Sequence, residues 1–133
     1  TGTNEFRCTF RSAEFYLTAA EAALELNDMD NARHYLTELM KKRYLSAIYP
    51  TYEAEILSMT QDELREEIYN ERFRELAFEG HRWFDLRRTT RQELTKTYKG
   101  ETYVLQKDDS RYTLRIPADA IEANPGLEEE NRE

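Results

Sequence analysis

Two glutamates at helical spacing are the residues of this chain that come nearest to a catalytic arrangement. Glu71 and Glu75 are four residues apart, so both carboxylates would lie on one face of a helix, where a pair can act as general acid and general base. Arginines crowd the same segment, at Arg72, Arg74 and Arg82, and a neighbouring cation favours the ionised carboxylate over the protonated acid. We therefore interpret the two glutamates as partners in structural ion pairs, and the sequence predicts no catalytic residue.

No other constellation of residues indicates a metal or a cofactor. His34 and His81 lie on different predicted elements, and neither has a second ligand one helical turn away. The four glycines are scattered rather than gathered in a phosphate-binding loop, and no serine lies in a nucleophile-elbow motif. The sequence therefore predicts no metal ion and no cofactor. Cys8 is the single cysteine, and we interpret it as a small core residue.

Nine tyrosines make the chain rich in aromatic side chains, which can stack on the apolar faces of sugar rings. Most of these aromatic side chains are expected to belong to the core. Tyr44, Tyr49 and Tyr52, which surround Pro50, are the candidates for an exposed surface, although packing or a protein interface is favoured over a glycan platform. The sequence alone identifies no ligand-binding residue.

The segment from Asn70 to Arg88 alternates charges and aromatics in a way that a solvated helix would not require. At 100° per residue, its charges at positions 72, 75 and 79 fall in the same helical sector as the apolar residues at 64, 68 and 76. Because an unpaired buried ion is costly, these charges need partners, either among the arginines after Gly80 or in another chain. The predicted structural ion-pair network consists of Glu71, Arg72, Glu75, Glu79, Arg82, Asp85 and Arg88.

The composition narrows the possible classes of protein and of binding partner. A chain of 133 residues is the size of one domain, and 39% hydrophobic with 35% charged residues is typical of amphipathic helices with solvated outer faces. No apolar run is long enough for a transmembrane helix. The net charge of -8 would repel nucleic acid and anionic membrane surfaces, so a neutral ligand or a protein is the expected partner.

The hydrophobic pattern predicts a helix hairpin over residues 10–46 and a second helix pair over residues 60–90. In the hairpin, Ala20 and Ala32 would let two helices approach closely across a short polar turn, as in tetratricopeptide-like (TPR-like) repeats. Tyr49-Pro50 disfavours helix, so residues 47–59 are expected to form a connection.

The second pair would begin with a capping box at Thr60-Gln61-Asp62-Glu63, and its first helix would run to Glu79 before Gly80 ends it. A short helix to Arg88 would complete the pair. Residues 101–127 are expected to form a β-hairpin, with strands at 102–105 and 112–116, and then a short helix. The predicted fold is mainly α, an α–α superhelix of TPR-like helix pairs with a small C-terminal β-hairpin, in a single domain of residues 1–133.

Three segments carry motifs that occur together in one protein family. The pattern Glu-Arg, Glu-Leu, Glu-Gly-x-Arg-x-x-Asp-Leu-x-Arg is formed by Glu71, Arg72, Glu75, Leu76, Glu79, Gly80, Arg82, Asp85, Leu86 and Arg88. It is preceded by the helix from Arg11-Ser12-Ala13-Glu14 to Ala20-Glu21-Ala22, and followed by Arg115-Ile116-Pro117 and Asn124-Pro125-Gly126-Leu127. As a set, and in this order, these motifs resemble the SusD/RagB family of outer-membrane nutrient-binding lipoproteins. The Arg-x-Arg that usually closes the second helix in that family is Lys41-Lys42-Arg43 here.

The resemblance implies a non-catalytic protein that binds a nutrient, an oligosaccharide or another glycan above all, and sits as a lid on a SusC-like TonB-dependent outer-membrane transporter. It also implies attachment to the cell surface by an N-terminal lipid anchor outside this chain, which would be the C-terminal portion of a longer protein. Ligand contacts would come mainly from parts outside this chain. Two alternatives remain open: a TPR-type protein–protein interaction adaptor, for which residues 10–46 argue, and a glycan-degrading enzyme, for which only the carboxylate pairs argue.

Overall fold

The computed structural model describes residues 11–128 of the chain. Internal contacts separate it into two compact units, Thr1–Arg82 and Trp83–Glu133. Cys8, the start of the first predicted helix at Phe10 and the acidic segment 129–133 lie outside the described residues. The prediction of a single domain therefore stays a prediction, and the fold follows unit by unit.

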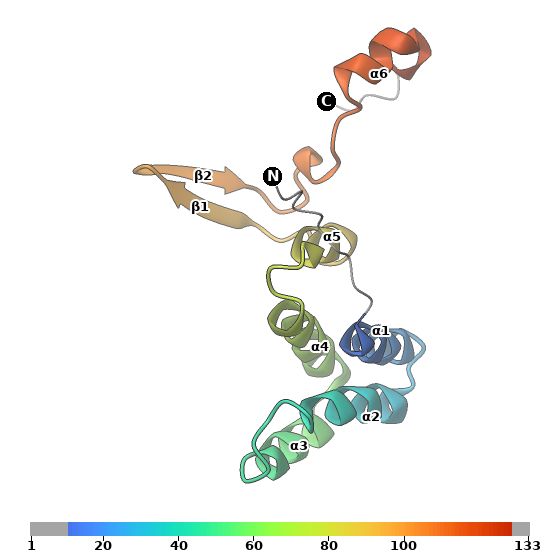
Figure 1. Ribbon diagram of the computed structural model, residues 1–133, viewed down its shortest axis with the longest axis vertical. Helices are drawn as coiled ribbons and strands as arrows, with labels where there is room; N and C mark the ends of the chain where they lie inside the picture. The colour runs from blue at the N-terminus through green and yellow to red at the C-terminus, as the bar shows by residue number, and fades with distance from the viewer. Residues whose placement is uncertain (1–10, 129–133) are drawn as a thin grey trace, which may run out of the picture. The chain divides into compact units, whose positions relative to one another are not determined.

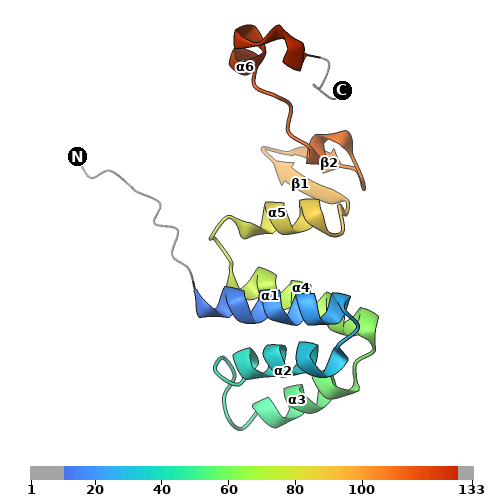
Figure 2. The same ribbon diagram turned by 90° about the vertical axis from the view of Figure 1, so that its right-hand side faces the viewer.

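The first unit contains the helices α1 (Ser12–Glu25), α2 (Met29–Met40), α3 (Tyr49–Ser58) and α4 (Gln61–Glu75). Helix α1 packs against α2 and also against α4, while α2 contacts α3. Figures 1 and 2 show the same arrangement from two sides: α1 and α4 lie side by side, α2 lies next to both, and α3 lies beyond α2. The predicted helix hairpin is thus the pair α1 and α2, and α4 closes over it.

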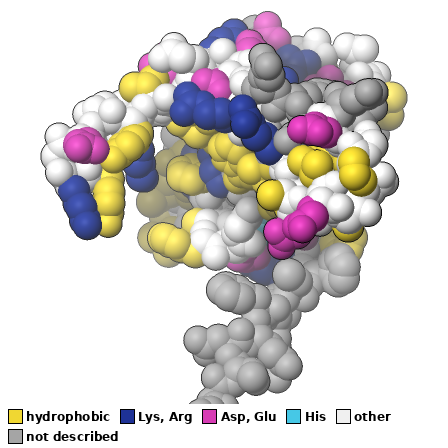
Figure 3. Space-filling view, turned by 90° about the horizontal axis from the view of Figure 1, so that it is seen from above, with side chains coloured by type: hydrophobic (Ala, Val, Ile, Leu, Met, Phe, Trp, Pro, Cys, Tyr) yellow, Lys and Arg dark blue, Asp and Glu magenta, His cyan; other side chains and the backbone are white. Residues whose placement is uncertain are grey.

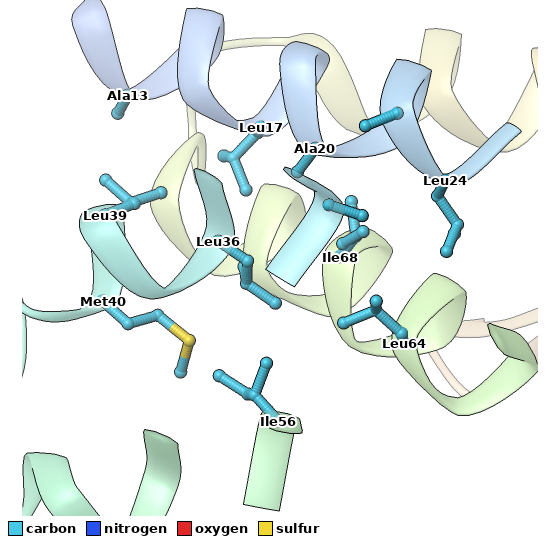
Figure 4. Packing of buried hydrophobic residues seen from close by; sticks show 12 residues of the cluster. Ala13, Leu17, Ala20, Leu24, Leu36, Leu39, Met40, Ile56, Leu64 and Ile68 are labelled. Carbon is cyan, nitrogen blue, oxygen red and sulfur yellow. The ribbon is translucent and has the colours of Figure 1, made fainter. Parts of the chain in front are cut away.

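One hydrophobic core holds these helices together, and its members lie on the faces that the sequence pattern predicts (Figure 4). Helix α1 contributes every third or fourth residue, and α2 and α4 contribute theirs from the facing stripes. The largest fully buried side chains of this unit are aliphatic or methionine, which fill space without a polar group that needs a partner. The buried core residues include Ala13, Leu17, Ala20, Leu24, Ala32, Leu36, Leu39, Met40, Ile56, Leu64 and Ile68.

Local signals set the ends of the helices. The Thr60 hydroxyl accepts a hydrogen bond from the Glu63 amide at 3.4 Å, and the Glu63 carboxylate accepts one from the Thr60 amide at 2.8 Å, which confirms the predicted capping box. Gly80 has a φ of +83°, the left-handed conformation predicted for it. Helix α4 ends at Glu75, however, four residues before the predicted Glu79, and Phe78 in the turn that follows also has a positive φ of 66°.

The predicted connection over residues 47–59 is wrong, since most of it forms α3. Pro50 lies in the first turn of this helix, where a backbone amide would have no intrahelical partner, so the proline costs no hydrogen bond there. Buried Ile56 then anchors α3 to the core. Tyr49-Pro50 therefore begins a helix where the sequence pattern predicts a break.

The second unit contains a small antiparallel sheet, which agrees with the predicted fold class, but its strands differ from the predicted ones. Strand β1 (Leu94–Tyr98) pairs with β2 (Glu101–Leu105), from Leu94 opposite Leu105 to Tyr98 opposite Glu101. Lys99 and Gly100 join them with φ values of 49° and 82°, the signature of a type I′ turn. The hairpin thus spans residues 94–105, before most of the predicted range of 101–127.

The segment predicted as the second strand, residues 112–116, is not a strand. Tyr112 ends a 3₁₀ helix, η1 (Ser110–Tyr112), which Asp109 caps by accepting a hydrogen bond from the Arg111 amide at 2.9 Å. The Tyr112 side chain is fully buried, stacks on Trp83 with ring centroids 5.1 Å apart, and donates its hydroxyl to the Gln92 carbonyl. Core packing of one large ring therefore overrides the alternating pattern that suggested a strand.

The remaining elements are short. Helix α5 (His81–Arg88) contains the boundary between the two units, and α6 (Ala118–Ala123) and the 3₁₀ helix η2 (Pro125–Leu127) follow the hairpin. The predicted short helices near Arg88 and Pro117 are both present. Among the described residues, no helix is both long enough and apolar enough to cross a membrane.

We expect Ala20→Leu and Ala32→Leu each to lower the free energy of unfolding by about 1–3 kcal/mol, because both methyl groups are fully buried between packed helices and added methylenes have no space. Ala22→Leu is the matched control, since Ala22 is exposed on the same helix as Ala20. Chemical denaturation of the three variants is the measurement. Wild-type stability in both core variants would contradict the close packing of α1 and α2.

Candidate functional site: a charged junction between helices and exposed aromatic side chains

Charged side chains occupy the inward face of α4 near its end, as the helical pattern predicts. Glu71 and Arg72 are only 4% and 6% exposed, and the Glu75 side chain is 7% exposed. They follow Leu64 and Ile68 on the same helix, so the apolar stripe of α4 changes into a charged one within two turns. Buried charges of this kind are tolerated only with specific partners.

Glu75 is the centre of an ion-pair cluster that joins three segments of the first unit. Arg43, which follows α2, donates to both carboxylate oxygens of Glu75, with Nε–Oε2 and Nη2–Oε1 distances of 2.7 and 2.8 Å. Arg11, directly before α1, pairs with the same carboxylate and with Glu79, and its Nη1 donates to the Glu75 carbonyl at 2.9 Å. We refer to Arg11, Arg43, Glu75 and Glu79 as the Glu75 junction.

The electrostatics of the Glu75 junction favour a structural role. The hydrogen bonds and charge of Arg43, with a further contribution from Arg11, hold the pKa of Glu75 below its ordinary value, although burial opposes this. The same pairing raises the pKa of the Arg43 guanidinium. A carboxylate that stays ionised and is held by two guanidinium groups is poorly suited to donate a proton as a general acid.

Two other members of the predicted network lie on the neighbouring part of α4. Glu71 accepts a hydrogen bond from Arg74 Nε at 2.8 Å, and Arg74 also reaches Glu67 at 2.5 Å. Arg72 donates from Nη1 to the Thr18 hydroxyl of α1 at 3.3 Å, so its side chain crosses from α4 to α1. These contacts reinforce the packing of the same two helices.

The last three members of the predicted network lie close to or beyond Gly80. Arg82 places its guanidinium 4.6 Å from the centre of the Phe73 ring, a cation–π geometry. In the second unit, Asp85 accepts from Arg88 Nη2 at 2.7 Å, within one turn of α5. The expectation that arginines after Gly80 supply the partners of Glu75 and Glu79 is wrong, because both carboxylates pair with Arg11.

Sequence reasoning missed Arg11 and Arg43 as members of the cluster. Arg11 is separated from Glu75 by 64 positions and Arg43 by 32, so no local spacing connects them. The available signal was that Arg11 lies in the first turn and Arg43 in the last turn of a predicted helix, where a long side chain can reach past the helix terminus. The structure therefore assigns partners that helical periodicity alone does not identify.

The tyrosines around Pro50 pack inward. Tyr44, Tyr49 and Tyr52 are each partly buried against the core, and the rings of Tyr44 and Tyr52 lie 4.2 Å apart at 41°. The Tyr49 hydroxyl hydrogen-bonds Glu53 at 2.9 Å, and burial together with this carboxylate raises the pKa of Tyr49 to about 12. These contacts confirm packing as the main role of the three rings.

Other aromatic side chains are considerably more exposed. Phe73 and Phe78 near the end of α4, Phe84 in α5, and Tyr98 and Tyr103 in the hairpin each expose more than half of their surface. In the view of Figure 3, exposed hydrophobic side chains lie among charged ones. These rings belong to both units, and singly exposed apolar side chains are ordinary on protein surfaces, so their exposure alone assigns no binding site.

Neither histidine lies in a metal-binding arrangement within residues 11–128, where no group of three or more His, Cys, Asp or Glu residues is placed to hold an ion. The His34 ring contacts Tyr35, with centroids 5.6 Å apart. The His81 Nδ1 atom lies 3.8 Å from a carboxylate oxygen of Glu14. Both histidines thus have packing or polar neighbours of the ordinary kind.

Comparison with known proteins connects this arrangement to one family. The model of the SusD family matches residues 1–132, which is nearly the whole chain. A SusD-like protein, P25, from Formosa agariphila is 40% identical over 80 residues, which cover 60% of this chain and 14% of that protein. The match spans about one seventh of the length of this relative. The family model thus covers the charged end of α4 and the helices of the first unit that it joins, and the chain belongs to the SusD family.

Proposed function

We propose that this chain is the C-terminal portion of a cell-surface nutrient-binding protein that captures oligosaccharides or other glycans and does not cleave them. The observation that carries the proposal is the match of the SusD family model to residues 1–132, supported by a SusD-like relative. In this proposal the full protein is held at the outer membrane by an N-terminal lipid anchor outside this chain. Its partner is a SusC-like TonB-dependent transporter, to which it passes the bound nutrient.

The geometry of the charged residues supports binding and hand-over rather than catalysis. The carboxylates that come nearest to an acid–base pair are committed to guanidinium partners, Glu75 to Arg11 and Arg43, and Glu71 to Arg74. A glycosidase needs one carboxyl group that is protonated at working pH, and these partners have the opposite effect. The helices of the first unit therefore serve as a scaffold, and most ligand contacts come from parts of the protein outside this chain.

A glycan array probed with the full-length protein that contains this chain tests the proposal. We expect retention of a related set of oligosaccharides, and an unchanged glycan after incubation, because binding is not followed by cleavage. Failure to retain any glycan, together with specific capture of a peptide, would support the TPR-type adaptor instead. Cleavage of a retained glycan would place the protein among the enzymes.

A further inference from the structure

Helix α1 is apolar around more of its circumference than its contacts with α2 and α4 require. Its core face, which includes the fully buried Leu17 and Leu24, packs against those two helices. Its glutamates, at positions 14, 21 and 25, are seven and four residues apart and therefore share one sector of the helix. A helix that is apolar around most of its circumference is normally covered on more than one side.

A second apolar stripe lies on the side of α1 opposite the core face. It consists of Phe15, Ala19, Ala22 and Leu26, which follow one another at steps of four, three and four residues. We call these four residues the outer stripe. Phe15 is 64% exposed and Leu26 is 79% exposed, and Ala22 is exposed between them. Alternating steps of three and four are the spacing of a seam between two packed helices.

Helix α3 shows what an outer face looks like when it is built for water. Its exposed residues include Thr51, Ala54, Glu55 and Ser58, so Ala54 is surrounded by polar side chains. A terminal helix of a repeat stack needs such a polar outer face to remain soluble. The outer stripe of α1 lacks polar side chains, which indicates that α1 is not the end of a stack.

The TPR-like pairing of α1 and α2 indicates what covers the outer stripe. In a stack of helix pairs, one pair cannot bury its apolar faces alone and buries the remaining face against the next pair. Helices α2 and α4 occupy the core face of α1, which leaves the outer stripe for a further helix. The matched segment covers only 14% of the SusD-like relative, so a protein of that length contains ample chain for another pair.

A separate molecule fits the outer stripe less well than a segment of the same polypeptide. A standard interface between separate proteins uses about 20–30 residues on each side. The outer stripe offers four side chains, two of which are alanines. Separate molecules also lose translational and rotational freedom when they associate, a cost that a tethered segment largely avoids.

We propose that the outer stripe of α1 is the docking seam for an amphipathic helix from the part of the same polypeptide outside residues 1–133. This inference rests on the proposed function, in which the chain is the C-terminal portion of a longer protein. The docked helix places its larger apolar side chains over Ala19 and Ala22, between Phe15 and Leu26. It thereby extends the hydrophobic core of the first unit into a longer stack.

The test measures cysteine labelling by N-ethylmaleimide, site by site with peptide mass spectrometry, in the full-length protein and in the 133-residue chain. Ala22→Cys reports on the outer stripe, Ala20→Cys is the buried reference, and Ala54→Cys is the exposed reference on α3. In the isolated chain, Ala22→Cys should react within about threefold of Ala54→Cys. In the full-length protein it should react at least about a hundredfold more slowly, close to Ala20→Cys, because covered thiols react only after local opening.

Equal labelling rates at Ala22→Cys and Ala54→Cys in the full-length protein would overturn the seam. Protection of Ala22→Cys already in the isolated chain would overturn it as well, since residues 1–133 would then cover the stripe themselves. Protection that disappears on dilution would assign the stripe to a second copy. Protection that is independent of concentration and confined to the full-length protein supports the seam. Because labelling needs no glycan, a failure of glycan binding would overturn the proposed function without changing this result.

Discussion

Replacing Glu75 by alanine is expected to lower the free energy of unfolding of this chain by about 2–4 kcal/mol, because it removes the shared partner of two arginines. The Glu75 side chain is only 7% exposed and meets Arg11, which precedes α1, and Arg43, which follows α2. Both arginines are more exposed than Glu75, so water can solvate part of each stranded charge and the loss stays below that of a fully buried pair.

Two further variants separate the charge of Glu75 from its shape. Glu75→Gln keeps the size of the side chain and should lose most of the same stability, since a neutral amide cannot hold two guanidinium groups as a carboxylate does. Glu66→Ala is the matched control, because Glu66 is exposed on the same helix and should change stability by less than about 0.5 kcal/mol. Equal small effects at both positions would show that the Glu75 junction contributes little.

The pH dependence of stability has a definite sign at this site. Folding lowers the pKa of Glu75 through its hydrogen bonds with Arg43, so the folded protein binds the proton less readily than the unfolded chain does. The stabilisation is therefore complete above the unfolded pKa of about 4.3 and is lost as the pH falls through the lower pKa of the folded state. Denaturation curves of wild type and Glu75→Gln should converge as the pH falls from 6 to 3. Parallel curves over this range would contradict the assignment.

Replacing Arg72 by alanine is expected to cost about 3 kcal/mol, because Arg72 is 6% exposed and its removal leaves polar groups at the α1–α4 contact without a cationic partner. At 6% exposure the aliphatic part of the Arg72 side chain is also removed from water, so its loss adds to the loss of the charge. Arg72→Met keeps most of the aliphatic volume and should recover part of the loss.

Thermal and chemical denaturation of Arg72→Ala, Arg72→Met and Lys42→Ala measure these contributions. Lys42 is exposed after α2, so its alanine variant should melt as wild type does. If Arg72→Ala and Lys42→Ala shift the melting temperature equally little, the inward face of α4 is solvated and its charges do not hold the helices together.

The helices of the first unit could be predicted from the sequence because their signals are local. Small and apolar residues of α1 repeat at helical spacing, at Ala13, Leu17, Ala20 and Leu24. The capping box at Thr60 marks the start of α4. The prediction at Pro50 is wrong because proline disfavours helix at most positions but is tolerated in the first turn. The sequence alone does not show whether Pro50 breaks a helix or begins one.

The strands of the second unit were harder to predict because two signals competed. Tyr112 continued an alternating pattern, but its ring is fixed by Trp83 and the Gln92 carbonyl, contacts that span 29 and 20 positions. Residues 101–105 pair with residues 94–98, and Lys99-Gly100 is the signal for this pairing. It is a two-residue turn with glycine at its second position, where a positive φ is required.

The sequence predicts that an ion-pair network exists near the end of α4, but it does not predict which residues pair with which. Glu75 is identifiable from the sequence because a charge lies in an apolar helical sector, which is a property of one segment. Its partners Arg11 and Arg43 depend on how α1, α2 and α4 pack, so they became visible only in three dimensions. The aromatic residues show the same limit: Tyr44 and Tyr52 pack inward, while Tyr98 and Tyr103 are exposed on the hairpin.

Calorimetry on this chain and on the full-length protein, with one shared glycan panel and an assay of reducing-sugar release on the same samples, tests the proposed binding function. We predict tight binding of a neutral oligosaccharide by the full-length protein, binding by the isolated chain that is weaker by at least about a hundredfold, and no sugar release by either, because the charged residues of this chain form a scaffold. Comparable affinity of both proteins would place the principal site within residues 1–133. Release of reducing sugar by either would contradict the proposal of a non-catalytic binding protein.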